Sequence, residues 1–295
     1  MDRYTSGMSP RPTRSFNLDS FKHQLATKIL PRFILIAMCL VYFFPFYQMI
    51  ITSLKTTKEL NTFPPTLWPH TFVWSNYVDA VKYIRFFRFT LNSLTIAGGV
   101  TIGAIISNSL IAYGFARIHW PGRDKLFFLA IATLFIPFPV TIVALFDIFA
   151  KIHWVNTYLP LIVPAFFGQA FNIFLMRQFL MEIPREISEA ARIDGSNELQ
   201  TFWVVILPLL RPAIAVVAIF SGVGAWNDFL TPLLFLNSED LYPLSIGLQF
   251  YRSSHNVAYT LLMAASTLVV LPLIVLFLSF QKFFIEGVTV GSIKG

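Results

Sequence analysis

Residues 189–212 have the sequence EAARIDGSNELQTFWVVILPLLRP, a polar stretch in a chain that is otherwise strongly apolar. Just upstream, Pro184 suits the first turn of a helix, where its missing N–H costs nothing. Gly195 fits the left-handed position at which helices commonly end. Pro208 and Pro212 precede the next apolar run. The spacing predicts two short helices joined at Gly195.

Each predicted helix has a distinct face. In the first helix, small residues in the middle of one face let another surface approach the backbone; that face holds Ile187, Ala190, Ala191 and Asp194. In the second helix, the same i, i+3, i+4, i+7 spacing predicts an apolar stripe; the stripe holds Leu199, Phe202, Trp203 and Ile206. By spacing alone, the hairpin either docks on another protein or packs under the rest of this chain.

The composition outside this stretch is that of a membrane protein. Of the 295 residues, 56% are hydrophobic and 13% are charged, against about 25% charged in soluble domains. The single cysteine, Cys39, excludes an intrachain disulfide. Five histidines (His23, His70, His119, His153 and His255) share no metal-ligand spacing, so we expect no metal site. The fold class predicted is all-α and polytopic.

Six apolar runs reach the roughly 20 residues that a helix needs to cross a bilayer. They are residues 33–53, 90–115, 126–148, 158–180, 213–235 and 260–283. Internal prolines such as Pro137 and Pro139 are tolerated in membrane helices, where they mark kinks. The first run lacks a small-residue cleavage site and is predicted to be an uncleaved anchor.

Charge distribution predicts the orientation. With both termini inside, 15 of the 22 Lys and Arg residues fall in inner segments and seven in outer segments. Cations concentrate on the cytoplasmic side of membrane proteins, so we expect cytoplasmic termini, and the net charge of +7 reflects topology and not nucleic-acid binding. Lys82, Arg85 and Arg88 oppose the trend; they alternate with aromatic residues in a predicted interfacial helix.

These features predict the following organisation. It comprises a cytoplasmic N-terminal segment (residues 1–32), a first transmembrane helix (33–53), an external loop with an interfacial helix (54–89), a five-helix core (90–285) that includes a cytoplasmic loop (181–212), and a cytoplasmic tail (286–295).

The polar stretch resembles the signature loop of permease subunits of ATP-binding-cassette (ABC) importers. The matching positions are Glu189, Ala190, Ala191, Asp194, Gly195, Phe202, Leu207, Pro208 and Pro212. Ser196 departs mildly, since the family more often has alanine there. Four other segments are similar to the carbohydrate-uptake, maltose-type branch; they are NSLTIAGG, IAYGFARIHWPGR, WNDFLTP and the terminal GVTVGSIKG.

The resemblance implies a MetI-like type I importer permease in a prokaryotic cell membrane. The loop would form coupling helices in a cleft of a homodimeric cytoplasmic ATPase, which would bind ATP and magnesium. A second, homologous permease would complete a heterodimer, and an extracytoplasmic solute-binding protein would deliver a sugar, polyol or glycerophosphate ester. The terminal GVTVGSIKG would reach toward the ATPase, unless it is simply a frayed end.

The residues themselves indicate no catalytic centre and no cofactor. No glycine is followed by Lys-Ser or Lys-Thr, so the chain has no Walker A loop to bind ATP. Small residues in two spans, such as Gly99, Gly103 and Gly222, are expected to permit close helix packing. ATP hydrolysis is therefore expected from a partner.

Polar residues inside the predicted spans are candidates for a substrate path, because burying them in lipid is expensive. They are Gln169, Asn172, Trp226, Asn227 and Asp228, together with Asn108, for which an interhelical hydrogen bond is the favoured role. For the others, either an interhelical bond or substrate contact fits, and Trp226 could stack on a sugar.

Two outer segments, residues 55–89 and 236–257, are rich in aromatic and polar residues that suit docking of the binding protein. An ion-coupled secondary transporter is the main alternative function. It would need intramembrane carboxylates and often has inverted repeats. We find no internal repeat, and Asp228 is the one acid well inside a predicted span.

Overall fold

The computed structural model describes residues 25–252 and 257–290, with the side chains of residues 25, 26 and 282–290 also left aside. His23, His255, most of the predicted N-terminal segment and residues 291–295 of the tail lie outside the described residues. The regular secondary structure of the described residues is helical, with one isolated bridge between Arg252 and Val257. The prediction of an all-α fold is confirmed.

Four described helices are long and apolar enough to cross a membrane: Thr27–Ser53, Phe86–Ala116, Leu159–Glu182 and Tyr259–Gln281. Two further pairs pass the same test only together. Arg123–Phe135 and Phe138–Lys151 meet at 100°, and Glu198–Leu209 and Arg211–Asn227 meet at 79°. Six spans, and the side on which each terminus lies, therefore remain predictions.

Two predicted spans differ from the structure. The third is sharply bent at Pro137, which cannot donate the backbone hydrogen bond that continues a helix. The fifth was expected to run over residues 213–235, but its helix ends at Asn227, and a separate helix begins at Leu230. The expectation of one continuous fifth helix is wrong.

The chain divides into two compact units, residues 1–50 and 51–295. Within the first unit, a π-helical turn, η1 (Leu25–Ile29), leads into α2 (Leu30–Ser53), which contains Pro45. Side chains of the described part of this unit are largely exposed, including Phe33 at 69% and Val41 at 71%. An apolar helix of this kind is suited to lipid or to a partner helix.

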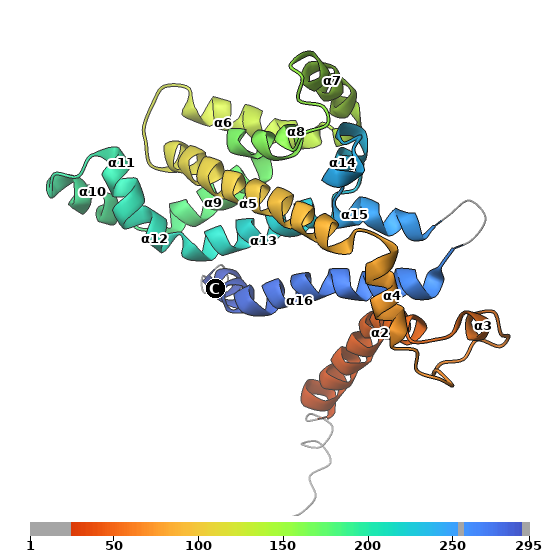
Figure 1. Ribbon diagram of the computed structural model, residues 1–295. Coiled ribbons are helices and arrows are strands. Elements are labelled where there is room, and N and C mark those ends of the chain that lie inside the picture. The colour runs from red at the N-terminus through yellow and green to blue at the C-terminus, as the bar shows by residue number, and fades with distance from the viewer. Residues whose placement is uncertain (1–24, 253–256, 291–295) are drawn as a thin grey trace, which may run out of the picture. The chain divides into compact units, whose positions relative to one another are not determined.

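The second unit is built around α5 (Phe86–Ala116), which packs against α9 (Ala170–Glu182) and α13 (Arg211–Asn227); α13 in turn packs on α16 (Tyr259–Val290) (Figure 1). Two buried clusters result. One joins α5, α9 and α13 to residues 202–210, and the other joins α4, α5, α13 and α16.

Shorter elements complete this unit. They are α3 (Thr57–Leu60), α4 (Ser75–Tyr83), α6 (Arg123–Ala132), η2 (Thr133–Phe135), α7 (Phe138–Lys151), α8 (Leu159–Ile162), η3 (Val163–Phe167), α10 (Arg185–Ile193), α11 (Glu198–Gln200), η4 (Thr201–Ile206), α12 (Leu207–Leu209), α14 (Leu230–Phe235), η5 (Glu239–Leu241), α15 (Leu244–Gly247) and η6 (Leu248–Tyr251).

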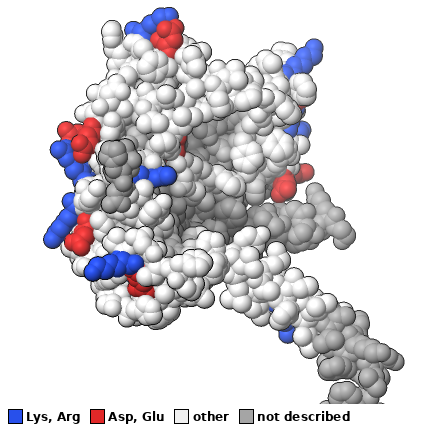
Figure 2. Space-filling model, turned by 90° about the vertical axis from the view of Figure 1, so that its right-hand side faces the viewer, with Lys and Arg blue, Asp and Glu red and all other residues white. Residues whose placement is uncertain are grey.

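The small residues of α5 permit close packing, as predicted. A Cβ added at Gly99 would lie 2.8 Å from Ile162, and one at Gly103 would lie 2.6 Å from the Phe166 ring. The face of the molecule seen in Figure 2 is mostly uncharged, and its Lys, Arg, Asp and Glu side chains gather in small groups, mainly toward its edges. Such a surface suits contact with lipid.

Candidate functional site

The motif residues form a loop hairpin, residues 184–210, in which α10 is followed by α11, η4 and α12. Gly195 adopts a φ of +88°, a conformation that glycine reaches without steric cost. Its N–H bonds to the Arg192 carbonyl, and the Ser196 N–H bonds to the Ala191 carbonyl, each at 3.0 Å. This pair of bonds is a Schellman motif. The prediction that Gly195 ends the first helix is confirmed.

The second half of the hairpin begins with reciprocal capping. The Asn197 side chain accepts from the Gln200 N–H at 2.8 Å, and the Gln200 side chain accepts from the Asn197 N–H at 3.0 Å. This arrangement satisfies two backbone donors that the start of a helix leaves unpaired. The angle between the two halves is therefore held by local bonds on both sides of Gly195.

A carboxylate ties the hairpin to α5. Glu198 accepts a hydrogen bond from Arg192 at 2.7 Å and another from the Tyr113 hydroxyl at 2.8 Å. The bond from Arg192 holds the pKa of Glu198 below its ordinary value of 4.5, although burial opposes the shift. The same bond raises the pKa of Arg192. Glu198 thus stays ionised at neutral pH and links three elements.

The predicted four-residue stripe does not form, and this expectation is wrong for two of its members. Phe202 and Ile206 are 1% and 0% exposed and belong to the buried cluster of α5, α9 and α13. Leu199 and Trp203 are exposed at 61% and 46%. The physical reason is that residues 201–206 form a π-helix, whose i→i+5 bonds change the helical period that the stripe assumed.

Other motif residues divide between a buried and an exposed face of α10. Ala191 is buried, whereas Glu189, Ala190 and Asp194 are exposed, as is Pro208 in α12. Sequence reasoning missed Ile193, which is 86% exposed beside Asp194. An isoleucine outside the small-residue face of a polar helix is the signal that could have identified it. The exposed surface of the hairpin is partly apolar.

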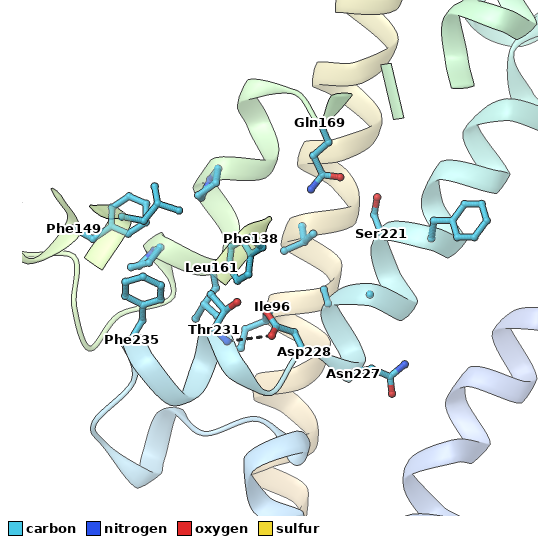
Figure 3. Close-up of a pocket in the computed structure, with 17 residues that line it drawn as sticks. Ile96, Phe138, Phe149, Leu161, Gln169, Ser221, Asn227, Asp228, Thr231 and Phe235 are labelled. Atoms are coloured by element: carbon cyan, nitrogen blue, oxygen red, sulfur yellow. Dashed lines mark hydrogen bonds between the residues drawn. The ribbon is translucent and has the colours of Figure 1, made fainter. Parts of the chain in front are cut away.

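A separate cavity of about 530 Å³ lies between α5, α7, α8, α13 and α14. In Figure 3, Gln169 and Ser221 lie toward one side and Phe149 and Phe235 toward the other, with Asp228 between them. Asp228 accepts a hydrogen bond from the Thr231 N–H at 3.1 Å. The volume of the cavity, and its apolar lining with a few polar groups, suit a small-molecule site.

Three of the five candidate path residues line this cavity: Gln169, Asn227 and Asp228. The Asn227 amide points away from the other labelled side chains (Figure 3) and donates to the Val223 carbonyl at 3.0 Å. The aromatic wall of the cavity, which includes Phe138, Phe149 and Phe235, was not singled out in the sequence. Aromatic residues within the third and fifth apolar runs, or directly after the third, were the available signal.

The other two candidates lie in the helix packing. Asn172 is 3% exposed and donates to the side chains of Gln169 and Ser221 at 2.7 and 3.2 Å. Trp226 is 5% exposed and its indole donates to the Val269 carbonyl at 3.3 Å. Trp226 therefore packs between helices in this structure, and its stacking on a sugar stays a prediction. Neither residue lines the cavity.

Asn108 has the interhelical role expected of it. It is fully buried, and its oxygen accepts from the Gln169 N–H at 2.7 Å. Asn108 thereby positions the start of α9, beside the cavity.

The two aromatic outer segments meet in the structure. Arg85 forms ion pairs with Glu239 and Asp240. Asn92, on α5, donates to the carbonyls of Asp240 and Tyr242 at 2.8 and 2.9 Å. Residues predicted to form two separate docking segments therefore share one surface. Across residues 27–252 and 257–281, whose side chains the structure describes, no three His, Cys, Asp or Glu side chains gather as a metal site would require.

Comparison with known proteins gives a family match. The profile of the family described as "Binding-protein-dependent transport system inner membrane component" matches residues 99–290. An arabinooligosaccharide transport system permease of Halalkalibacterium halodurans is 35% identical over 258 residues, which cover 85% of this chain and 91% of the relative. A sulfoquinovosyl glycerol transport system permease of Agrobacterium fabrum is 31% identical and covers 90% and 93%.

Solved structures show the same fold. A chain of a bacterial ABC transporter involved in import of the acidic polysaccharide alginate superimposes with a TM-score of 0.79 at 22% identity, covering 94% of this chain and 100% of that one. A second structure, of a bacterial alginate ABC transporter in complex with a periplasmic protein bound to an alginate pentasaccharide, gives a TM-score of 0.66 at 16% identity, covering 90% and 95%.

Proposed function

The chain belongs to the family of binding-protein-dependent transport system inner membrane components, and from that premise we propose that it is the permease subunit of an ABC importer for a sugar or a related polyol or glycerophosphate-type solute. The two relatives named above are permease proteins of transport systems for arabinooligosaccharides and for sulfoquinovosyl glycerol. A carbohydrate-like solute is common to these names, and it supports the substrate class.

The loop hairpin is the observation that carries the proposal. Its Schellman turn at Gly195 and its capping at Asn197 set the geometry of a rigid projecting element, and its exposed residues include Ala190, Ile193, Leu199 and Trp203. A rigid, partly apolar projection suits insertion into a cleft of a partner. We assign that partner as a homodimeric ATPase, which binds the ATP and magnesium.

The proposed topology follows from the charge distribution. Cytoplasmic termini place the hairpin on the cytoplasmic side and place the shared surface of residues 85–92 and 239–242 outside. That outer surface, held together by Arg85 and Asn92, is where we place the solute-binding protein. A second, homologous permease is proposed to pack against apolar faces of the helices, the remainder of which face lipid.

The cavity beside α14 is proposed to be this subunit's share of the solute path. Asp228 directly follows the end of α13, where the predicted fifth span is broken into two helices. A helix break in a membrane protein exposes backbone polar groups to a cavity, where a solute can use them. Gln169 and Asp228 supply polar groups, and the aromatic wall suits the apolar face of a sugar ring.

Reconstitution tests the proposal directly. Proteoliposomes that hold this chain, its permease partner and the ATPase should take up the solute only with ATP and binding protein present. The purified chain alone should hydrolyse no ATP. Hydrolysis by a clean preparation of this subunit, or uptake driven by an ion gradient without the ATPase, would contradict the proposal.

Docking is tested by cross-linking from the exposed face of α10. Cysteines introduced at Ala190 and Ile193 should cross-link to the ATPase in an active complex. A cysteine at Ala191, which is 8% exposed, is the matched control and should react poorly. Equal reaction at all three positions, or none in an active complex, would contradict docking through this face.

A further inference from the structure

A second, smaller cavity of about 160 Å³ lies between the end of α5 and the helix α10. It is separate from the cavity beside α14. Four of its lining residues lie on one face of α10: Arg185, Ser188, Glu189 and Arg192. The other two, Arg117 and His119, come directly after the end of α5 in the chain.

Two of the lining residues are deeply buried and have unpaired polar atoms. Arg117 is 6% exposed, and its Nη2 donates to the carbonyls of Leu180 and Ile183 at 2.6 and 2.5 Å. Its Nε has no hydrogen-bond partner among the described residues, and neither does Oγ of Ser188, which is 2% exposed. Leaving a buried donor unpaired costs about 1–3 kcal/mol. Both residues line the same small cavity, and buried polar atoms without partners require an explanation.

Two of the exposed lining residues are arginines. Arg185, Arg192 and His119 are exposed, with Glu189 as the one carboxylate of the lining. Arg192 is already paired with Glu198, whereas Arg117 and Arg185 have no ion pair among the described residues. Burial lowers the pKa of Arg117, and the neighbouring charges of Arg185 and Arg192 lower it further. The lining therefore holds three arginines against one carboxylate.

We propose that this cavity binds a phosphate group through Arg117, Ser188 and Arg185. Guanidinium groups and a hydroxyl are donors that suit the oxygens of a tetrahedral oxyanion. The volume is roughly five times the ~30 Å³ share of one water molecule, which leaves room for such a group. Bound there, the phosphate bridges α5 and α10 and so stiffens the base of the loop hairpin.

Two kinds of molecule carry a phosphate group that suits this cavity. Arg117 directly follows the last residue of α5, a helix long enough to span the bilayer. The cavity is therefore near the level of lipid headgroups, so the phosphate belongs either to a phospholipid or to a free phosphate in solution. The inference does not depend on the transport activity.

The test uses the full chain purified in detergent. Inorganic phosphate is titrated at constant ionic strength, with amide hydrogen exchange of residues 185–193 and the melting temperature as readouts. Bound phospholipid is measured by native mass spectrometry after addition of phosphatidylglycerol. The variants are Ser188→Ala and Arg185→Gln, and Arg211→Gln, which removes an exposed arginine outside the cavity, is the matched control.

The expected result is saturable protection by phosphate, or one retained phospholipid, in the wild type and in Arg211→Gln. Each cavity variant should weaken that binding by about tenfold or more, as expected for loss of a hydrogen bond to a charged group. Ser188→Ala should not lower the melting temperature without phosphate, because it removes a donor that has no partner. Arg185→Gln, at an exposed position, provides the second reading if Ser188→Ala misfolds.

The two sources are distinguished by which probe responds. Saturation with inorganic phosphate indicates the free anion, and a phospholipid lost only from the cavity variants indicates a headgroup. No response to either probe overturns the proposal, as does an equal response in all four proteins, which indicates surface screening only. Weaker ATPase association in Ser188→Ala without a response to either probe assigns the cavity to a protein partner, and also overturns it.

Discussion

The Tyr113 hydroxyl donates a hydrogen bond of 2.8 Å to the Glu198 carboxylate, and so joins the last turn of α5 to the second half of the loop hairpin. The Tyr113 ring also packs 5.3 Å from the ring of Phe202, centroid to centroid. Glu198 in turn holds Arg192 of α10. Displacement of the hairpin must therefore act on α5, the central helix of the second unit, through these contacts.

The variant Tyr113→Phe should weaken this connection without altering the ring packing. Loss of one hydrogen bond to a charged group is expected to cost about 1–2 kcal/mol, because Glu198 keeps its bond to Arg192. Melting in detergent and amide exchange of residues 198–206 measure the effect. Tyr259→Phe, at an exposed tyrosine, is the control. Equal stability of the two variants would show that the Tyr113 bond contributes nothing.

The connection should also weaken in acid. The bonds from Arg192 and Tyr113 lower the pKa of Glu198 from 4.5. A carboxylate whose pKa is lower in the folded than in the unfolded protein stabilises the folded state at pH values above its unfolded-state pKa. This contribution is lost as the pH falls through the folded-state pKa. We expect hairpin amide exchange, corrected for its intrinsic pH dependence, to be constant from about pH 6 to 8 and to accelerate below about pH 4.5. Glu198→Gln should abolish this dependence; an unchanged acid response would assign it to another group.

Replacement of Gly195 should disturb the hairpin through its backbone alone. No atom lies within 4 Å of an added Cβ, but φ is +88°, and a β-carbon there costs roughly 1–2 kcal/mol. Gly195→Asp should leave the protein inserted and paired with its permease partner, yet weaken ATPase association and uptake.

A β-branched residue and an asparagine separate strain from side-chain chemistry at this position. Gly195→Val should be more disruptive, and Gly195→Asn milder, since asparagine tolerates the left-handed region. Solute uptake and co-purification of the ATPase measure how strongly each variant disrupts the hairpin. Full transport by Gly195→Val would contradict the requirement for a positive φ.

Two glycines of α5 provide a matched test of helix packing. An added Cβ at Gly103 would lie 2.6 Å from the Phe166 ring, whereas at Gly98 nothing lies within 4 Å. Gly103→Ala should destabilise by about 1–3 kcal/mol through overpacking. Gly98→Ala should be neutral or stabilising by up to about 1 kcal/mol, because alanine favours the helix. Melting curves decide, and equal effects would contradict the close packing of α5 on η3.

The charge of Asp228 can be separated from its hydrogen bond. The side-chain oxygen of asparagine accepts a hydrogen bond as a carboxylate does, so Asp228→Asn should retain the bond to the Thr231 N–H while it removes the charge. If the charge faces the solute, uptake by Asp228→Asn should change at unaltered stability and assembly. Asp228→Ala should in addition lose about 0.5–2 kcal/mol of stability.

Asn227→Ala is the neighbouring control, because its amide points away from the other labelled side chains (Figure 3) and donates to the Val223 carbonyl. It should affect uptake less than Asp228→Asn does. Normal uptake by Asp228→Asn would remove Asp228 from the solute path. Failure of that variant to assemble would assign it a structural role.

By itself, the sequence determined what depends on local composition and spacing. The sequence correctly predicted that α5 and α16 are long apolar helices. It also predicted the close packing at the small residues of α5 and the end of α10 at Gly195. Each is decided by residues that are close in the chain: a run of side chains that avoids water, a glycine where φ must be positive, a gap where a side chain is missing. The same local rules indicated an all-helical membrane protein.

Only the tertiary structure decided which apolar and polar groups this chain buries for itself. Phe202 and Ile206 are as apolar as Leu199 and Trp203, yet the first pair packs into the core because a π-helix turns it toward α5. Trp226 is buried by α16, from a distant part of the chain. Arg117 and Ser188 are brought together across 71 positions of sequence around one cavity. These outcomes depend on contacts between distant segments, which the local hydrophobic pattern does not specify.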